Sequence, residues 1–253
     1  MNALEVEGLV KSYRGFLAVN NVSFAVRPGE MLAMIGPNGA GKTTCFNMIN
    51  GQIAPTGGHV RLFGHSIEGL PPHRIARLGV GRTFQIAATF GSMTLAENVQ
   101  IARLAHDGEL WPSLRSAARR RRDEALAGLA RVGLADLAEK LSAEIAYGDV
   151  KRLELAIALA SDPRLLLMDE PAAGMAPSER RALMSLTEQI ARERGIGVLF
   201  TEHDMDIVFG HADRVVVLNR GEVIAEGAPN EVRMRKDVRE IYLGAGSLHE
   251  ATR

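Results

Sequence analysis

A glycine-rich segment, Gly36-Pro37-Asn38-Gly39-Ala40-Gly41-Lys42-Thr43, directly follows the apolar run Met31–Ile35 and opens a helix-like stretch over residues 42–50. Five consecutive apolar residues are typical of a strand that is covered on both faces of its sheet. Glycines allow backbone N–H groups to crowd around phosphate oxygens, and the following helix points its positive end at the same anion. The sequence therefore predicts a phosphate-binding loop, in which Lys42 reaches the β- and γ-phosphates and Thr43 ligates Mg²⁺.

Strand and helix patterns alternate on both sides of this loop. Short apolar or alternating runs predict further strands around residues 4–9, 22–26, 57–64, 80–84, 165–168, 197–201, 214–218 and 221–227. Residues 94–160 are rich in Ala, Leu and Arg, which favours helices. Another helix is predicted over residues 178–194, with Ser178 as its N-cap. This alternation predicts an α/β fold built on a parallel sheet with helices on both faces.

Composition limits the class of protein. The 253 residues carry 30 basic and 30 acidic side chains, so nothing in the net charge favours nucleic acid as a partner. Cys45 is the single cysteine, which excludes an internal disulfide and is consistent with a reducing compartment. Apolar runs are far shorter than the roughly 20 residues that span a bilayer. We therefore expect the isolated chain to be soluble, with any membrane role depending on a partner.

Two acids end one of the predicted strands. Asp169 and Glu170 follow the apolar run over residues 165–168, and ligands collect beyond the carboxyl ends of parallel strands. We expect Asp169 to hold Mg²⁺ through water and Glu170 to polarise the attacking water. Taken alone, such a pair is more often a turn or a helix cap. The phosphate loop favours the catalytic interpretation.

Three other residues complete the candidate site. His203 follows the strand over residues 197–201, where it can contact the γ-phosphate and hold Glu170 and water in line. Gln85 follows the strand over residues 80–84 and is a candidate sensor of Mg²⁺ and water. Tyr13 ends the first strand, where its ring can stack on adenine. Each has an ordinary alternative: a structural histidine, an uninformative glutamine and a core tyrosine.

The ordered set of Tyr13, the loop over residues 36–43, Gln85, the acids 169–170 and His203 resembles ATP-binding cassette (ABC) transporter ATPases over essentially the full chain. The resemblance implies a P-loop NTPase (RecA-like) core with an antiparallel β subdomain and an inserted helical subdomain. It assigns residues 1–86 and 151–253 to the ATP-binding catalytic core. Residues 87–150 would form the helical subdomain that contacts the permease.

Within this family the chain is most similar to ATPases of branched-chain or hydrophobic amino-acid importers. The supporting segments are Ala18-Val19-Asn20-Asn21-Val22, Arg82-Thr83-Phe84-Gln85, Ala146-Tyr147-Gly148, Glu170-Pro171-Ala172-Ala173-Gly174, Glu226-Gly227-Ala228-Pro229 and Tyr242-Leu243-Gly244. The resemblance implies that the chain converts ATP and water to ADP and phosphate and couples this to solute uptake. ATP and Mg²⁺ are the implied cofactors.

The resemblance also implies the roles of individual residues. The catalytic residues would be Glu170, His203 and Gln85, and the metal ligands Thr43, Gln85 and Asp169. The residues that bind ATP would be Tyr13, Gly36, Pro37, Asn38, Gly39, Ala40, Gly41, Lys42, Thr43, Thr44, Ala146 and Gly148. Implied partners are transmembrane permease subunits, a second and different ATPase chain in a head-to-tail dimer, and indirectly a solute-binding protein, with no nucleic acid. The chain would lie peripherally on the cytoplasmic face of the inner membrane.

Two segments depart from the family pattern. The family signature is usually Leu-Ser-Gly-Gly-Gln, whereas this chain has Ile145-Ala146-Tyr147-Gly148-Asp149. The serine hydroxyl is lost, although the helix N-terminus and the Gly148 N–H can still meet a γ-phosphate across a dimer. The loop after the acids ends Gly174-Met175-Ala176, where an acidic or amide residue is commoner. These changes predict one weaker site and put communication between the two sites in question.

Other functions remain open from sequence alone. The same machine can serve another solute, such as urea, short amides or exported lipopolysaccharide. Soluble ABC proteins of DNA repair carry long arms between the phosphate loop and the signature, which the short spacing between Lys42 and Gly148 does not allow. Those of translation usually carry two cassettes, and this chain has one. A regulator without hydrolysis is disfavoured by the intact Glu170 and His203, and a GTPase by the lack of an Asn-Lys-x-Asp motif.

Overall fold

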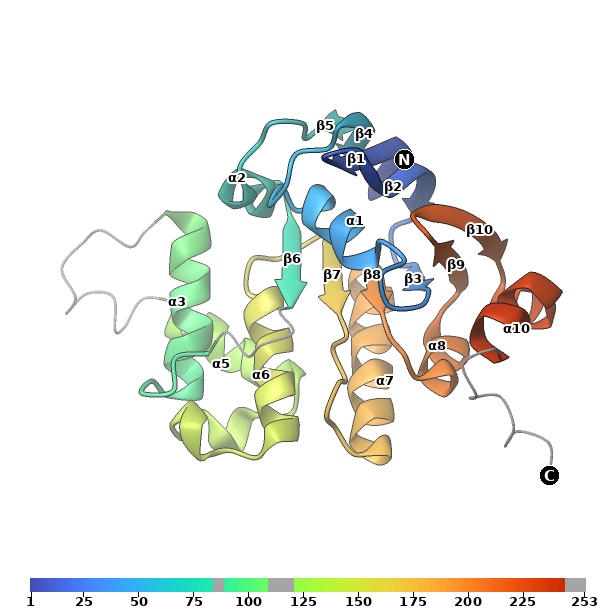
Figure 1. Ribbon diagram of the computed structural model, residues 1–253. Coiled ribbons are helices and arrows are strands. Elements are labelled where there is room, and N and C mark those ends of the chain that lie inside the picture. The colour runs from blue at the N-terminus through green and yellow to red at the C-terminus, as the bar shows by residue number, and fades with distance from the viewer. Residues whose placement is uncertain (84–88, 109–120, 244–253) are drawn as a thin grey trace, which may run out of the picture.

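The computed structural model describes residues 1–83, 89–108 and 121–243 and has two β-sheets (Figure 1). The larger sheet has the strand order β10-β9-β3-β8-β7-β6, and the smaller one the order β2-β1-β4-β5. The strands of the larger sheet are β3 (Met31–Ile35), β6 (Val80–Thr83), β7 (Leu165–Asp169), β8 (Gly197–Thr201), β9 (Arg214–Asn219) and β10 (Glu222–Gly227). Those of the smaller sheet are β1 (Leu4–Tyr13), β2 (Phe16–Val26), β4 (Gly57–Leu62) and β5 (His65–Ser66).

Helices surround the larger sheet and extend away from it. The α-helices of the described residues are α1 (Lys42–Ile49), α2 (Pro72–Arg77), α3 (Leu95–Asp107), α5 (Arg122–Arg131), α6 (Tyr147–Leu159), α7 (Pro177–Arg194), α8 (Met205–His211), α9 (Pro229–Met234) and α10 (Lys236–Leu243). Two short 3-10 helices, Ala135–Leu137 and Ser142–Glu144, lie between α5 and α6. Within the described residues no helix is both long enough and apolar enough to span a bilayer.

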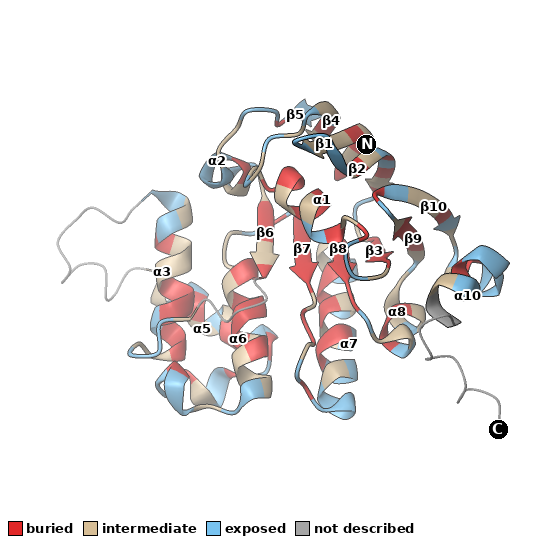
Figure 2. Ribbon diagram, viewed as in Figure 1, coloured by how far each residue is buried: buried red, intermediate tan, exposed pale blue. Residues whose placement is uncertain are grey.

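The predicted α/β fold is confirmed. Strands β9, β3, β8, β7 and β6 are parallel neighbours, and only β10 joins this sheet antiparallel, as a hairpin with β9. The smaller sheet is antiparallel throughout. Strands β7 and β8 are buried along their whole length (Figure 2), as continuous apolar runs require.

The alternation of side chains along β3 separates the core into two layers. Met31, Ala33 and Ile35 pack with the helices of one face, including α6 and α7. Leu32 and Met34 face the opposite way and pack with α1 and the antiparallel sheet. Because successive side chains of a strand point to opposite faces, one five-residue run supplies both layers. The phosphate loop leaves the carboxyl end of this fully buried strand, which gives the loop a rigid base.

Strand β1 carries a bulge that explains its irregular pattern. Leu4, Val6 and Leu9 of this strand are all buried. Strict alternation would place Leu9 on the opposite face from Val6. The register shifts between these two residues, around Gly8 with its positive φ of 57°, so the strand gains one residue and Leu9 returns to the core.

Ser178 is not the N-cap of its helix, so this prediction is wrong. The helix α7 begins at Pro177, and Ala176 is its N-cap. Proline is favoured at the first helical position, because its φ suits the helix and its missing N–H would be unpaired there. The carboxylate of Glu179 accepts the Ala176 N–H at 3.4 Å, which supplies half of a capping box. The sequence also gave no sign of the short helix α2.

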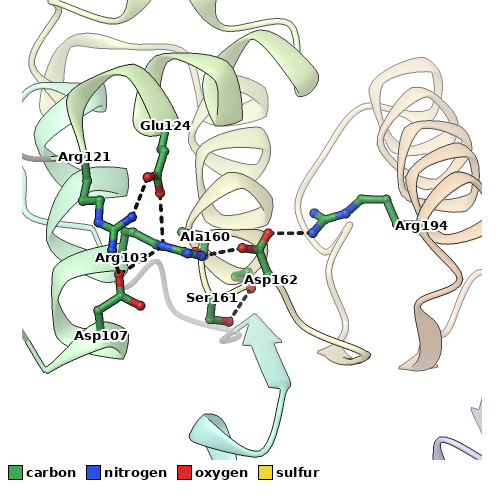
Figure 3. Close-up of polar contacts among 9 residues, drawn as sticks. Arg103, Asp107, Arg121, Glu124, Ala160, Ser161, Asp162 and Arg194 are labelled. Atoms are coloured by element: carbon green, nitrogen blue, oxygen red, sulfur yellow. Dashed lines mark hydrogen bonds and ion pairs between the residues drawn. The ribbon is translucent and has the colours of Figure 1, made fainter.

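The helices α3, α5 and α6 pack together and share one hydrophobic core with the sheet. A network of ion pairs also joins them to α7 (Figure 3). Arg103 of α3 donates to Asp162, just beyond α6, at 2.5 Å and to the Ala160 carbonyl at 2.9 Å. Arg194, the last residue of α7, donates to the other Asp162 oxygen at 2.7 Å. Asp162 therefore bridges α3 and α7. The division of the chain at residues 86 and 150 stays a prediction.

We expect Asp162→Asn to lower the free energy of unfolding by about 1 kcal/mol at pH 7. The Asp162 side chain is 57% exposed, so solvent screening limits each of its two ion pairs to about 0.2–1 kcal/mol. Burial raises the pKa of this carboxyl, but the hydrogen bonds from Arg103 and Arg194 outweigh burial and lower it.

A carboxyl with a lowered folded pKa stabilises the protein above its unfolded pKa of about 3.9 and loses this effect as the pH falls through the folded value. The difference between wild type and variant should therefore be full at pH 7 and shrink below about pH 4. Urea unfolding at pH 7 and at a pH below about 4 measures this difference in the free energy of unfolding. Asp136→Asn is the control, since among the described residues Asp136 has no ion pair. A difference independent of pH would contradict this account.

Candidate functional site

The glycine-rich loop lies between β3 and α1, with no space for side chains at its two ends. A Cβ atom on Gly36 would lie 2.2 Å from the carbonyl oxygen of Leu218, and one on Gly41 would lie 2.7 Å from that of Ala18. Both distances are shorter than any real contact, and both glycines have positive φ. The loop can therefore pass this close to its neighbours only with glycine at these positions. Gly39, at the exposed tip, has open space around it.

Lys42 is folded back over the loop that precedes it. Its Nζ donates to the Gly36 carbonyl at 2.6 Å and to the Pro37 carbonyl at 3.2 Å, and the residue is buried. Burial lowers the pKa of the ammonium, while the negative charges of Glu170 and Asp169 oppose this shift. An ammonium group has three donors, so one more hydrogen bond is available to an anion at the mouth of the loop.

The carboxyl ends of β7 and β8 meet beside the loop and bring the predicted acids and histidine together. Glu170 Oε1 and His203 Nε2 are 2.9 Å apart, although 33 positions separate them in sequence. The Thr201 hydroxyl donates to Asp169 Oδ1 at 2.7 Å and accepts the Glu170 N–H at 3.0 Å. Because Thr201 is fully buried, this hydroxyl holds both acids rigidly in place. Its position at the end of an apolar strand was the only sequence signal for it.

Glu170 has a backbone conformation that is unusual for a side chain with a Cβ. Its φ is 49°, in the left-handed region. Such residues cost about 1–3 kcal/mol in strain and persist where the surroundings determine them. The Glu170 N–H is held by both the carbonyl and the hydroxyl of Thr201. The backbone bends at this point, and Glu170 lines the same cavity as the phosphate loop.

A cavity of about 340 Å³ opens between the loop and the turn from β1 to β2. Its lining residues are Tyr13, Phe16, Ala18, Asn38, Gly39, Ala40, Gly41, Lys42, Thr43, Thr44 and Glu170. Tyr13 and Phe16 are paired across the hairpin and are 47% and 70% exposed. Tyr13 is therefore exposed, which excludes the alternative that it is a core tyrosine. Phe16 was missed, although a second aromatic residue next to the Arg14-Gly15 turn was a usable signal.

Glu202 is a second residue that sequence reasoning missed. Its carboxylate is 5% exposed and accepts the Ala172 N–H at 2.9 Å, which ties the loop after Glu170 to the end of β8. Burial raises its pKa, and the backbone N–H groups of Ala172 and His203 oppose this shift. A buried carboxylate directly before the candidate histidine is therefore part of the framework of the site.

The predicted signature residues lie elsewhere. Ala146 and Gly148 do not line this cavity; Ala146 is the N-cap of α6 and Gly148 lies in its first turn. Within one chain the structure therefore does not bring the signature to the phosphate loop. Gln85 lies outside the described residues, so its place in the site stays a prediction.

The residues present fit a nucleotide with Mg²⁺. The loop excludes Cβ atoms at Gly36 and Gly41, and Lys42 offers a cation and a spare donor at its mouth. The paired aromatic rings offer a stacking surface at the other end of the same cavity. Thr43 is exposed at the start of α1, and with Asp169 it supplies the hard oxygen ligands that Mg²⁺ prefers.

A phosphate loop at the end of β3, with acids and a histidine at the ends of β7 and β8, defines a P-loop nucleotide-binding ATPase. Comparisons with known proteins place it further. The family model "ABC transporter" matches residues 19–173. The high-affinity branched-chain amino acid transport ATP-binding protein BraF of Pseudomonas aeruginosa is 42% identical over 248 residues, which cover 95% of this chain and 97% of that protein.

Solved structures agree. The ATP-binding cassette MJ1267 of an ABC transporter, in its ADP conformation, matches with a TM-score of 0.86 and 30% identity over 96% of this chain and 99% of that one. The dimeric post-hydrolysis state of the cassette MJ0796, bound to ADP and Pi, matches with a TM-score of 0.75 and 25% identity over 89% and 98%. The chain belongs to the ABC transporter family, as an ATP-binding cassette. The activity of this class is ATP hydrolysis.

Proposed function

We propose that this chain hydrolyses Mg-ATP to drive the uptake of branched-chain or other hydrophobic amino acids through permease subunits in the membrane. The observation that carries the hydrolytic role is the pair of Glu170 and His203, 2.9 Å apart beside the phosphate loop. The substrate class rests on the 42% identity with BraF, which extends over almost the whole of both chains. The departures from the usual family signature, at residues 145–149, do not change this proposed substrate class.

The proposed chemistry assigns each residue of this chain a separate task. Lys42 and the loop N–H groups bind the β- and γ-phosphates, and the ring of Tyr13 stacks on adenine. Thr43, Asp169 and Gln85 would hold Mg²⁺, which would supply positive charge to the phosphates. Glu170 accepts a proton from the attacking water, and His203 holds the Glu170 carboxylate in the orientation that this needs. Because Thr201 fixes both acids, little reorganisation is needed during the reaction.

The proposed assembly has two cassettes in a head-to-tail dimer. The dimeric cassette MJ0796 supports a second ATPase subunit, which we propose to be a different chain. Each composite site would join one chain's phosphate loop to the other chain's signature. The separation of Ala146 and Gly148 from the phosphate loop of their own chain supports this arrangement. Without the serine hydroxyl at Ala146, the site on the partner's loop would be the weaker one.

The remaining contacts would be with the membrane. We propose that residues 87–150 contact the permease, and that a solute-binding protein delivers the amino acid on the far side. The chain itself would then lie peripherally on the cytoplasmic face of the inner membrane. The transporter needs no nucleic acid. The permease and the binding protein would select the solute. The cassette would supply only the free energy for transport.

Uptake into proteoliposomes tests this function. The chain is reconstituted with the permease subunits and the second ATPase that co-purify with it, and with a solute-binding protein for branched-chain amino acids. We expect ATP-dependent accumulation of labelled leucine, isoleucine or valine, and none with ADP. Labelled urea and a short amide are the comparison solutes. Hydrolysis with uptake of urea instead of leucine would overturn the substrate class, and no hydrolysis by the full assembly would overturn the enzymatic role.

A further inference from the structure

The loop after Glu170 is held by side chains from three different elements. Its Ala172 N–H is accepted by Glu202, at the end of β8, at 2.9 Å. The Ala173 carbonyl accepts the hydroxyl of Tyr147, the first residue of α6, at 3.0 Å. The Met175 carbonyl accepts Nη2 of Arg180, in the first turn of α7, at 3.1 Å. Three of the four loop residues from 172 to 175 are therefore fixed through their backbone.

Two of these three contacts lead to the segment after β8 that carries His203. Glu202 directly precedes this histidine and is buried. Arg180 forms an ion pair with Asp204, the residue directly after the histidine, at 2.5 Å. Both neighbours of His203 thus hold the loop that begins at Glu170. These contacts keep the loop and β8 together as one unit, which maintains the Glu170–His203 distance.

Of these three side chains, Tyr147 is the one that lies on α6. We call α6 the signature helix, because it begins with the signature residues Tyr147 and Gly148. Its ring lies against Gly174, where an added Cβ would be 3.4 Å from the hydroxyl and ring atoms. Gly174 has a φ of 78°, so the chain turns there under the ring. One helical turn further along, Lys151 Nζ lies 5.5 Å from the centre of the same ring. The ring is thus placed by its own helix and by the loop.

This contact ties α6 to the catalytic loop of the same chain. The hydroxyl bond and the packing on Gly174 require Ala173 and the start of α6 to stay in register. A rigid movement of α6 must therefore displace the backbone three residues after Glu170 or break the bond. Since Glu170 already occupies a strained left-handed conformation, it depends on its surroundings to stay in place.

We infer that Tyr147 is a positioning residue that couples the signature helix to the hydrolytic centre of its own chain. The inference rests on the proposed function, in which Glu170 accepts the proton and the signature contacts the nucleotide bound to the partner cassette. Nucleotide binding at the partner's site would then change the position of Glu170 through the Tyr147 hydroxyl. The coupling would supply communication that the loop end Gly174-Met175-Ala176, with no acidic or amide side chain, does not offer.

Tyr147→Phe in the assembled transporter tests this coupling, because the variant keeps the ring and removes only the hydroxyl. A neutral hydrogen bond contributes about 0.5–1.5 kcal/mol, so we expect kcat for ATP to fall about two- to tenfold. KM for ATP should stay unchanged, and the thermal midpoint should fall by no more than about 2–6 °C. Hydrogen exchange gives a readout without turnover: the peptide that contains residues 171–175 should exchange faster in the nucleotide-free variant.

The matched control is Thr187→Val, which removes one hydroxyl-to-carbonyl bond of 2.9 Å within α7 and leaves the loop intact. It should change neither kcat nor exchange in the loop. Wild-type kcat and wild-type exchange in Tyr147→Phe would overturn the inference. So would a parallel loss of kcat, ATP affinity and stability, which indicates a purely structural role. A wild-type assembly without ATPase activity would instead overturn the proposed function, which separates the two failures.

Discussion

Glu170→Gln should lower the ATP turnover of the assembled transporter by a factor of about 10²–10⁴, the usual contribution of a positioned base. Glutamine preserves the shape of the side chain and its contact with His203, but it cannot accept a proton from water. Nucleotide affinity should therefore stay close to that of the wild type, because the phosphate loop is untouched. Steady-state turnover and calorimetric titration with Mg-ATP measure the two quantities separately.

The control for this substitution is Asp136→Asn, which removes a carboxylate that lies outside the cavity. Its turnover should match the wild type. Wild-type turnover in Glu170→Gln would show that another group accepts the proton. Loss of ATP affinity together with turnover would show instead that Glu170 acts in binding, and the proposed division of tasks within the site would be wrong.

Lys42→Ala should weaken Mg-ATP binding by a factor of about 10–100 or more. Each hydrogen bond from a charged donor contributes about 1.5–3 kcal/mol, and the lost ammonium faces the phosphates. The substitution also leaves the Gly36 and Pro37 carbonyls without their donor, so the loop itself should become less ordered. Calorimetry on the isolated chain measures the affinity for Mg-ATP. A lower thermal midpoint of unfolding would show that the loop has become less ordered.

Lys236→Ala is the matched control, because this ammonium is 92% exposed and lies on α10, outside the cavity. Its affinity for Mg-ATP should equal that of the wild type. Unchanged affinity in Lys42→Ala would contradict the assignment of the phosphate site. A large loss of stability with intact affinity per folded molecule would place Lys42 in the framework of the loop alone.

Local features of the sequence were enough to predict the central elements. The apolar run Met31–Ile35, the glycines and Lys42 are adjacent in the chain, so their strand, loop and helix follow from local preferences. The same holds for β7 with Asp169 and Glu170 at its end. Parallel topology then follows from the alternation of strands and helices, and the rule that ligands collect at strand ends pointed to the correct edge of the sheet.

Contacts between distant segments could not be predicted in this way. The hydroxyl of Thr201, the buried Glu202 and the bond from Tyr147 to Ala173 each join segments that are 26–32 positions apart. The sequence contains the residues of these contacts, but each residue type has many other possible partners. Only the neighbouring positions of β7, β8 and the start of α6 in the folded chain decide which partners meet.

The wrong N-cap prediction has a local origin instead. Ser178 is a good cap by composition, yet Pro177 begins the helix one residue earlier, where the chain leaves the loop held by Glu202 and Arg180. The sequence by itself thus determined the strands, the phosphate loop and the class of chemistry, because adjacent residues settle these. The tertiary structure alone decided the pairing of Glu170 with His203 and the link from Tyr147 to the catalytic loop, because both depend on how distant segments pack.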